Sequence, residues 1–390
     1  THWREYAVHW VHDVDHKFSY GARLKYLYGM ENFRTDVSYM GLTTDQNTHA
    51  LTFDKNFDLR SSGLPLMMIG NDSLGRKKAL GAIDTDDADM MAQAGLSSGN
   101  INNVTIVMSD NHWKGPLGNK TRHFFGKIYE GLPVDEPEFS IKYIDTRIFN
   151  GFARQSRNII EFVDDSLPKF SLFSDVYARP QVLARVHGND YDEMTFLLEE
   201  NKELLRGVIY QNEFKEKTRR ILKALSSDKL IESRFGIKIK YPTAYKTVKD
   251  TLNFTWIQKQ IPKGHLNIVI YSIPGYFTGE KINKTIIKIR DSIGKVYIPG
   301  RLKGSYMITE KAYRPYFYKT VLSERNAILT KGTWEVANDF MAGPFINYMV
   351  EDSLNKRRII IEGFTFAPSA KKRDYMFELE TIIKSTSFKH

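Results

Sequence analysis

The sequence contains no cysteine, and this absence removes several kinds of site at once. Without cysteine there are no disulfides, no thiolate-bound zinc or iron–sulfur clusters and no thiol nucleophile. The absence does not fix the compartment, because proteins of the cell envelope also occur without thiols.

Long apolar runs are absent as well. Residues 64–70 form the longest suggestive stretch, whereas a helical membrane span needs about 20 apolar residues. Residues 1–5 lack the basic and apolar regions of a signal peptide. We therefore expect the native gene product to begin upstream of residue 1.

Neither sign of charge dominates strongly. The 56 Lys and Arg residues exceed the 46 Asp and Glu residues by ten, so a polyanionic partner is compatible with the charge but not required by it. With 390 residues, of which 42% are hydrophobic, the chain has the composition of a globular protein with two or three domains. Wholly disordered and collagen-like classes are excluded.

Residues 1–63 alternate with a period of two, which predicts antiparallel strands. Phe18, Tyr20 and Leu24 share one face of such a strand, and Arg23 and Lys25 share the other. About four strands joined by hairpins are expected, near residues 5–12, 18–28, 36–42 and 49–60. An ordinary sheet with one buried face and a piece of a transmembrane β-barrel both fit this pattern.

Two segments favour the second interpretation. Residues 17–29 and 57–63 resemble the repeating hairpins of outer-membrane β-barrel proteins of Bacteroidota. The resemblance implies a barrel-like β-hairpin segment over residues 1–63. This segment is either part of the same polypeptide as residues 101–390 or a different polypeptide built into the same chain.

Residues 64–100 change to a small, polar composition of mixed charge, which is typical of a flexible linker. Residues 67–73 look like a lipoprotein junction from which the lipidated cysteine is missing. One hypothesis is therefore a lipid anchor near Asn71 that tethers the chain to a membrane surface.

Residues 101–390 alternate strands and helices and predict an α+β body with two lobes, 101–226 and 227–390. Strands are expected at 104–108, 266–271 and 358–366. Asp190 and Glu193 form a capping pair that opens a long helix through Leu225, with a break expected near Gly207. Further helices are expected from Pro116, along the isoleucine stripe of 282–293, and around 376–383.

The search for chemistry gives mostly exclusions. His9 and His12 would point to opposite faces of a strand, and the acidic residues 84–89 lack the glycine and glutamate of a calcium loop. Neither pattern therefore predicts a metal site, and we expect no cofactor and no catalytic residue. The basic stretches 215–220 and 371–373 are expected on solvated helix faces. Anionic lipid is the alternative partner for them, and nucleic acid is not expected, because no stacking aromatics accompany them.

Three stretches are denser in distinctive residues: 113–118, 290–307 and 334–345. Together with 157–160 and 362–368 they closely resemble a family of Bacteroidota outer-membrane lipoproteins, the domain of unknown function 4837, over about 101–386. One departure is Ala342, where a second glycine is expected. The resemblance implies an envelope location and a fold, but no reaction.

The residues singled out in these stretches are interaction or structural candidates. We expect buried turns, with Trp334 as an anchor. The candidates are Trp113, Arg290, Asp291, Trp334, Asp339, Gly343 and Pro344. Gly343 and Pro344 predict a turn. Asp291 and Asp339 predict pairing with Arg290 and local backbone, or alternatively a catalytic carboxylate pair assisted by Glu335.

The function expected from these observations is that of a non-enzymatic, lipid-anchored protein of the outer membrane. It would act as a subunit or accessory factor of an assembly, secretion or transport complex, with outer-membrane β-barrel proteins as partners. The alternatives are a carboxylate-dependent envelope hydrolase and a binding module for an anionic glycan or lipid. The last of these predicts an exposed basic groove and salt-sensitive binding.

Overall fold

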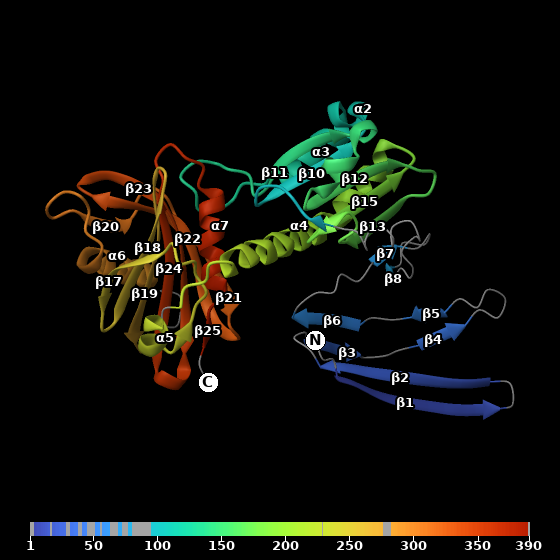
Figure 1. Cartoon of the computed structure of the whole chain (residues 1–390), viewed down its shortest axis with the longest axis horizontal. Coiled ribbons are helices and arrows are strands. Elements are labelled where there is room, and N and C mark those ends of the chain that lie inside the picture. Colours follow the sequence, from blue (N-terminus) through green and yellow to red (C-terminus); the bar gives the residue numbers. More distant parts are fainter. Residues whose placement is uncertain are drawn as a thin grey trace. The chain divides into compact units, whose positions relative to one another are not determined.

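The computed structural model divides the chain into two compact units, Thr1–Ile69 and Gly70–His390 (Figure 1). It describes residues 95–227, 229–275 and 282–388 with their side chains. Between residues 4 and 79 it describes the backbone of strands.

In the first unit the described strands form antiparallel pairs. The pairs are β1 (Arg4–Asp15) with β2 (Phe18–Tyr28), β3 (Asn32–Val37) with β6 (Phe57–Ser62), and β4 (Gly41–Thr44) with β5 (Leu51–Asp54). The antiparallel prediction is confirmed for these pairs. The stretches expected as single strands at 36–42 and 49–60 each contribute to two strands instead.

The chain from residue 63 to residue 94 contributes one further described pair, β7 (Ile69–Asn71) with β8 (Lys77–Ala79). The side chains of residues 1–94 lie outside the described residues. The aromatic face of the barrel-like interpretation, the histidines at 9 and 12, the anchor near Asn71 and the acidic residues 84–89 therefore stay predictions.

The first lobe, residues 95–222, contains a five-stranded sheet in the order β11-β10-β12-β15-β13. Four strands run parallel: β10 (Asn103–Met108), β11 (Ser140–Asp145), β12 (Asn158–Asp164) and β15 (Val182–Gly188). The edge strand β13 (Lys169–Ser174) is antiparallel. Residues 104–108 are buried throughout, as expected for a strand of a parallel sheet that is covered on both faces.

Three helices accompany this sheet: α2 (Asp110–Lys114), α3 (Pro116–Phe125) and α4 (Tyr191–Leu222). The predicted cap of α4 is confirmed, because Asp190 accepts a hydrogen bond from the Glu193 backbone N–H at 3.0 Å. The helix passes Gly207 without a break and ends three residues before the predicted Leu225. The predictions of a break and of that end are wrong.

A buried polar cluster fixes α4 to the sheet. Glu213 of α4 accepts hydrogen bonds from Arg157 Nε and from the Asn102 backbone N–H, both at 2.7 Å. Two contacts reach the end of the preceding segment. Arg157 also donates to the backbone oxygen of Asn100 at 2.7 Å. The short strand β9 (Gly95–Leu96) pairs with β14 (Ala178–Arg179). The linker expected over 64–100 is therefore packed on the first lobe at its C-terminal end.

The second lobe comprises residues 229–275 and 282–388 and contains a curled antiparallel sheet. In spatial order its strands are β17 (Lys246–Thr251), β18 (Phe254–Ile261), β19 (Gly264–Pro274), β24 (Arg357–Phe366), β23 (Asp339–Asp352), β22 (Arg325–Ala337) and β20 (Tyr306–Thr309). An eighth strand, β21 (Tyr316–Leu322), also pairs with β22. Short elements complete the lobe: α5 (Leu230–Phe235), the paired strands β16 (Ile237–Lys238) and β25 (Ser387–Phe388), and the 3-10 helix η3 (Ser353–Asn355).

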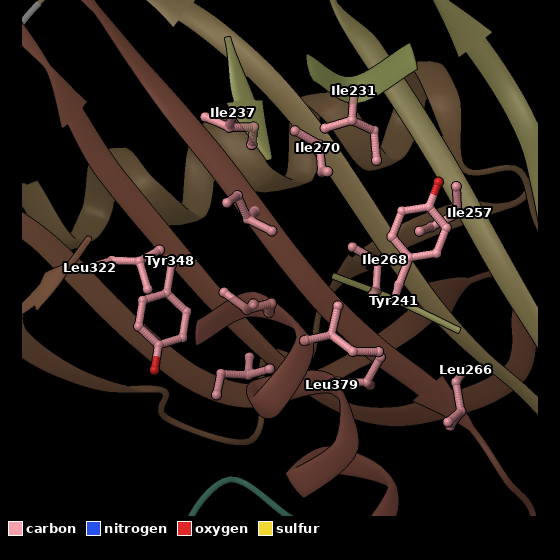
Figure 2. Packing of buried hydrophobic residues seen from close by; sticks show 14 of the residues in the cluster. Ile231, Ile237, Tyr241, Ile257, Leu266, Ile268, Ile270, Leu322, Tyr348 and Leu379 are labelled. Atoms are coloured by element: carbon pink, nitrogen blue, oxygen red, sulfur yellow. The ribbon is translucent and has the colours of Figure 1, made fainter. Parts of the chain in front are cut away.

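Each face of this sheet carries its own core. One cluster combines Leu379 of α7 (Arg373–Lys384) with Ile268 and Ile270 of β19 and Tyr348 of β23, as Figure 2 shows. On the other face, Ile286 of α6 (Ile282–Tyr297) joins a second cluster. Neighbouring residues of β24 alternate between the two clusters, as the pleat of a strand requires.

The predicted α+β class is confirmed. Among the described residues, no helix has both the length and the apolar character that crossing a bilayer requires.

Candidate functional site

The core between α6 and the sheet contains a buried ion pair. Arg290 of α6 donates to Glu362 of β24 through Nε, 3.0 Å from Oε1, and both side chains are about 1% exposed. Arg290 also donates to Thr309 Oγ1 at 2.9 Å and stacks over the Phe345 ring at 3.8 Å. Asn347 donates to Glu362 Oε2 at 2.8 Å. Arg290 is therefore a structural residue that fixes α6 on the sheet.

Trp334 and Gly343 are paired residues on that face of the sheet, Pro344 lies on the opposite face, and none of the three lies in a turn. Trp334 is buried in β22 and packs edge-on against Phe364. Gly343 and Pro344 lie within the continuous strand β23 and pair with β22, so the predicted turn is wrong. At Gly343 a Cβ atom would lie 2.1 Å from the backbone oxygen of Thr365, and this close approach requires glycine.

The two candidate carboxylates have separate partners. Asp291 Oδ1 accepts hydrogen bonds from the backbone N–H and the hydroxyl of Thr309 at 2.7 and 2.8 Å. Asp339 binds Arg301 through both oxygens, and this guanidinium lowers the pKa of the Asp339 carboxyl. Asp291 Oδ1 also lies 3.9 Å from Arg290 Nη1, in agreement with the expected pairing, but its backbone partner is 18 residues away and not local. Asp339 accepts the expected local hydrogen bond, from the Phe340 backbone N–H at 2.8 Å, and its cation is Arg301 and not Arg290.

Trp113 belongs to a different place, the surface of the first lobe. Its ring stacks on Tyr143 with a centroid distance of 4.6 Å, and the Arg122 guanidinium lies 4.3 Å from the ring centroid. The structure thus brings Arg290, Trp334 and Gly343 to one face of the sheet. It places Pro344 on the opposite face and Trp113 in the first lobe.

A groove of about 970 Å³ lies beside α6, the helix that carries Arg290. Lys284, Ile287 and Lys288 of α6 line one side of it. Pro315 and Phe317, at the start of β21, line the other side. Phe317 also packs against the core cluster that contains Phe345, so the apolar wall of the groove continues into the core.

Among the described residues that line this groove, the charge is of one sign. Lys284, Lys288 and Arg314 line it, and no described acidic residue does. All three cationic side chains belong to exposed residues, and none has an ion pair within the described part of the chain. A volume in the range of small-molecule sites, an apolar wall and three cations suit a ligand with an anionic head and an apolar body.

A second, smaller cavity of about 300 Å³ is lined by both lobes, including Tyr129, Arg206 and Phe377. Its charged groups are already engaged. Arg206 pairs with Glu138 at 2.5 Å, and Lys331 lies 3.7 Å from the buried Glu380 of α7. Because these charges neutralise one another, the cavity offers a ligand less than the groove does.

The basic stretches at 215–220 and 371–373 are only partly solvated. Lys217 binds Glu378 at 2.6 Å, and the buried Arg373 donates to the backbone oxygen of Pro137 at 3.0 Å. The predicted solvated face is wrong for these two residues. Within residues 95–227, 229–275 and 282–388, no group of three or more His, Asp or Glu side chains could hold a metal ion.

The sequence analysis did not identify the groove residues, although the sequence did indicate the helix that carries two of its three cations. The isoleucine stripe predicted α6, and Lys284 and Lys288 lie four residues apart on one flank of that stripe. Arg314 could not have been found, because only the fold brings the loop before β21 beside α6.

Comparisons with protein families divide the chain into three segments of unknown function. Residues 224–385 match a domain of unknown function (DUF4837), residues 97–222 match another (DUF8532), and residues 1–113 match a family of unknown function (DUF5723). A search of curated proteins finds no match.

Solved structures give only weak likenesses. A crystal structure of LpqN, involved in cell envelope biogenesis of Mycobacterium tuberculosis, is 10% identical and covers 40% of this chain and 83% of its own, with a TM-score of 0.26. Human StAR-related lipid transfer protein 5 is 10% identical and covers 44% of this chain and 97% of its own, with a TM-score of 0.16. These TM-scores do not establish a shared fold.

The family match corrects the extent of the resemblance expected from the sequence. The expected match began at residue 101, but the first lobe matches a different family model. It is residues 224–385, essentially the second lobe, that match the DUF4837 family.

Proposed function

We propose that the chain is a non-enzymatic binding protein of the cell envelope whose second lobe holds an anionic amphiphile in the groove beside α6. The single observation that carries this proposal is the set of three cations, Lys284, Lys288 and Arg314, beside an apolar wall, with no carboxylate among the described residues that line the groove.

The chemistry of the groove residues assigns a different part of the ligand to the cations and to the apolar side chains. The lysines and the arginine would bind a phosphate or carboxylate head, and Ile287, Pro315 and Phe317 would cover the first part of an acyl chain. Arginine in particular can give two hydrogen bonds to such a head. Attraction between exposed charges is screened by salt, so head binding should weaken as ionic strength rises.

The test is calorimetry with lysophosphatidylglycerol below its critical micelle concentration. Lysophosphatidylcholine, which has no net charge, and glycerophosphoglycerol, which has no acyl chain, should bind much more weakly. The double variant Lys284→Gln/Lys288→Gln should lose at least about tenfold in affinity. The double variant Lys223→Gln/Lys263→Gln, which removes equal charge at exposed residues outside the groove, should bind as the parent does.

Two results would contradict the proposal. Equal binding of the chain-free headgroup would indicate a plain anion site, and tighter binding of a sulfated glycan would indicate a glycan module. A hydrolase is not proposed, because Asp291 and Asp339 are engaged with Thr309 and Arg301.

The location rests on the family resemblance. We propose an outer-membrane location, with a lipid anchor near Asn71 that would keep the groove close to its ligand. The mass of the intact native protein tests the anchor, because an acyl modification adds a defined mass and its absence would end this hypothesis.

A second candidate function is that of a subunit docked on an outer-membrane β-barrel protein. The observation that favours it lies in the first lobe, where Ile148 and Phe152 are 65% and 73% exposed on adjacent 3-10 helices. Affinity purification from detergent should recover a barrel protein with the parent chain and lose it with Ile148→Ser/Phe152→Ser. Recovery of the same barrel protein with both chains would contradict docking through this surface.

A further inference from the structure

The hairpin between β22 and β23 carries an exposed aromatic side chain beside its turn. Phe340 is fully exposed, although phenylalanine is normally among the buried residues. The pairing of the two strands is irregular here, since Val336 pairs with Asp339 but Glu335 pairs with Ala342. Phe340 and Met341 are therefore extra residues in a bulge, and a bulge re-aims side chains at the end of a sheet.

A second exposed apolar side chain lies in a turn that contacts this hairpin. Leu302, 57% exposed, lies in the turn between α6 and β20. This turn is rigidly built, because Ser305 donates to the Leu302 backbone oxygen through both its N–H and its hydroxyl, at 3.0 and 2.6 Å. Arg301 joins the turn to the hairpin through its two hydrogen bonds to Asp339, at 2.7 and 3.1 Å.

Leu302 lies between two cations in the sequence, Arg301 and Lys303. Arg301 neutralises Asp339, the carboxylate that directly precedes Phe340, and its own side chain is still 66% exposed. Lys303 is exposed in the same turn and has no ion pair within the described residues. Phe340, Leu302, Arg301 and Lys303 form what we call the tip cluster.

We propose that the tip cluster is a membrane-contact site, at which Phe340 and Leu302 enter the interfacial region of an anionic lipid bilayer while Arg301 and Lys303 bind its headgroups. The chemistry fits this occupant. Aromatic and aliphatic side chains flanked by Lys and Arg are the usual composition of segments that lie in a membrane interface. A bilayer also places no demand on shape, which suits two protruding side chains better than a protein pocket would. The site does not depend on the groove being occupied.

The absence of cysteine allows a sharp test on the full chain. Phe340→Cys, labelled with an environment-sensitive fluorophore, should shift its emission to the blue with vesicles of phosphatidylcholine and phosphatidylglycerol. The shift should be small with phosphatidylcholine alone. The matched control is Leu354→Cys, which is 79% exposed in the turn at the opposite end of β23 and should show no shift.

Unlabelled variants complete the experiment. Phe340→Ser/Leu302→Ser should reduce the fraction that sediments with the anionic vesicles by about fivefold or more, and Lys303→Glu should raise the anionic lipid content needed for binding. Leu354→Ser should behave as the parent chain. Equal sedimentation of the parent and the double variant would overturn the proposal. So would an equal shift at positions 340 and 354. The double variant Phe340→Ser/Leu302→Ser should still bind lysophosphatidylglycerol as the parent does. Failure of the membrane-contact proposal can therefore be told apart from failure of the groove proposal.

Discussion

At the scale of single residues, the Arg290–Glu362 pair should behave as one unit. Removing one partner leaves an unpaired charge in an apolar core, which typically costs about 3–5 kcal/mol. Arg290→Met combined with Glu362→Leu removes both charges and should cost much less than the sum of the single changes. Chemical unfolding of the two single variants and the double variant measures this coupling. Additive losses would show that the two side chains act independently.

Glu380 of α7 should make stability depend on acid pH. Burial raises the pKa of this carboxyl, but Lys331, Lys384 and a hydrogen bond from Tyr129 outweigh burial and lower the pKa from 4.5 to about 2. Because the folded-state pKa lies below the unfolded-state value, the carboxylate stabilises the fold above about pH 4.5. That contribution, of about 3 kcal/mol, should be lost as the pH falls toward 2.

The measurement is the free energy of unfolding between pH 7 and pH 2 for Glu380→Gln. This variant should be less stable at pH 7, since two lysines lose their partner, but should lose less further stability on acidification. Glu200→Gln changes an exposed carboxylate of α4 and should follow the parent curve. A parental acid dependence in Glu380→Gln would assign the effect to other groups.

At the scale of elements, two helical glycines predict opposite outcomes for the same substitution. An added Cβ at Gly207 of α4 meets no atom within 4 Å, whereas at Gly294 of α6 it would lie 2.1 Å from the Met307 backbone oxygen. Gly207→Ala should therefore stabilise the protein by roughly 0.5–1 kcal/mol. Gly294→Ala should destabilise it, because β20 must move away from α6. Chemical denaturation measures the change in the free energy of unfolding for both variants. A higher stability of both would mean that α6 is not closely packed on β20.

The same elements show how far sequence patterns reach. The apolar stripe of α6 and the cap of α4 are local signals, because each is formed by residues that lie close together in the sequence. Both were predicted. The turn expected at Pro344 failed because proline is tolerated where it lies, just before the first residue of β23 that pairs with β24. The partner of Arg290 could not be predicted, since Glu362 is 72 residues away and a carboxylate gives no sign that it is buried.

At the scale of the whole chain, the alternation of strands and helices was enough to predict an α+β body, but not the contacts between its lobes. The groove and the tip cluster depend on the same kind of distant contact. Arg314 reaches α6 through the fold of β21 on β22, and Arg301 reaches Asp339 across 38 residues. Neither contact can be predicted from a sequence pattern, because exposed cations and loop residues do not recur with the spacing of a helix or a strand.

One contact between the lobes predicts that a change in the first lobe loosens a helix of the second. Glu136 accepts hydrogen bonds from the backbone N–H groups of Lys372 and Arg373, at 2.6 and 3.1 Å, and so caps the start of α7. The residue at the N-cap position, Lys372, provides no side-chain cap. Losing such a cap costs about 1–2 kcal/mol, and α7 supplies Met376 and Leu379 to the core of the second lobe.

Glu136→Ala should therefore speed amide hydrogen exchange within Arg373–Lys384, as measured by mass spectrometry, and Glu136→Gln should restore part of the protection. Asp135→Ala removes the same charge one residue earlier, from an exposed position, and is the matched control. Faster exchange in α7 with Glu136→Ala alone would mean that the lobes are coupled through this cap. Unchanged exchange, or the same increase with Asp135→Ala, would mean that α7 is held by its apolar face without help from the first lobe.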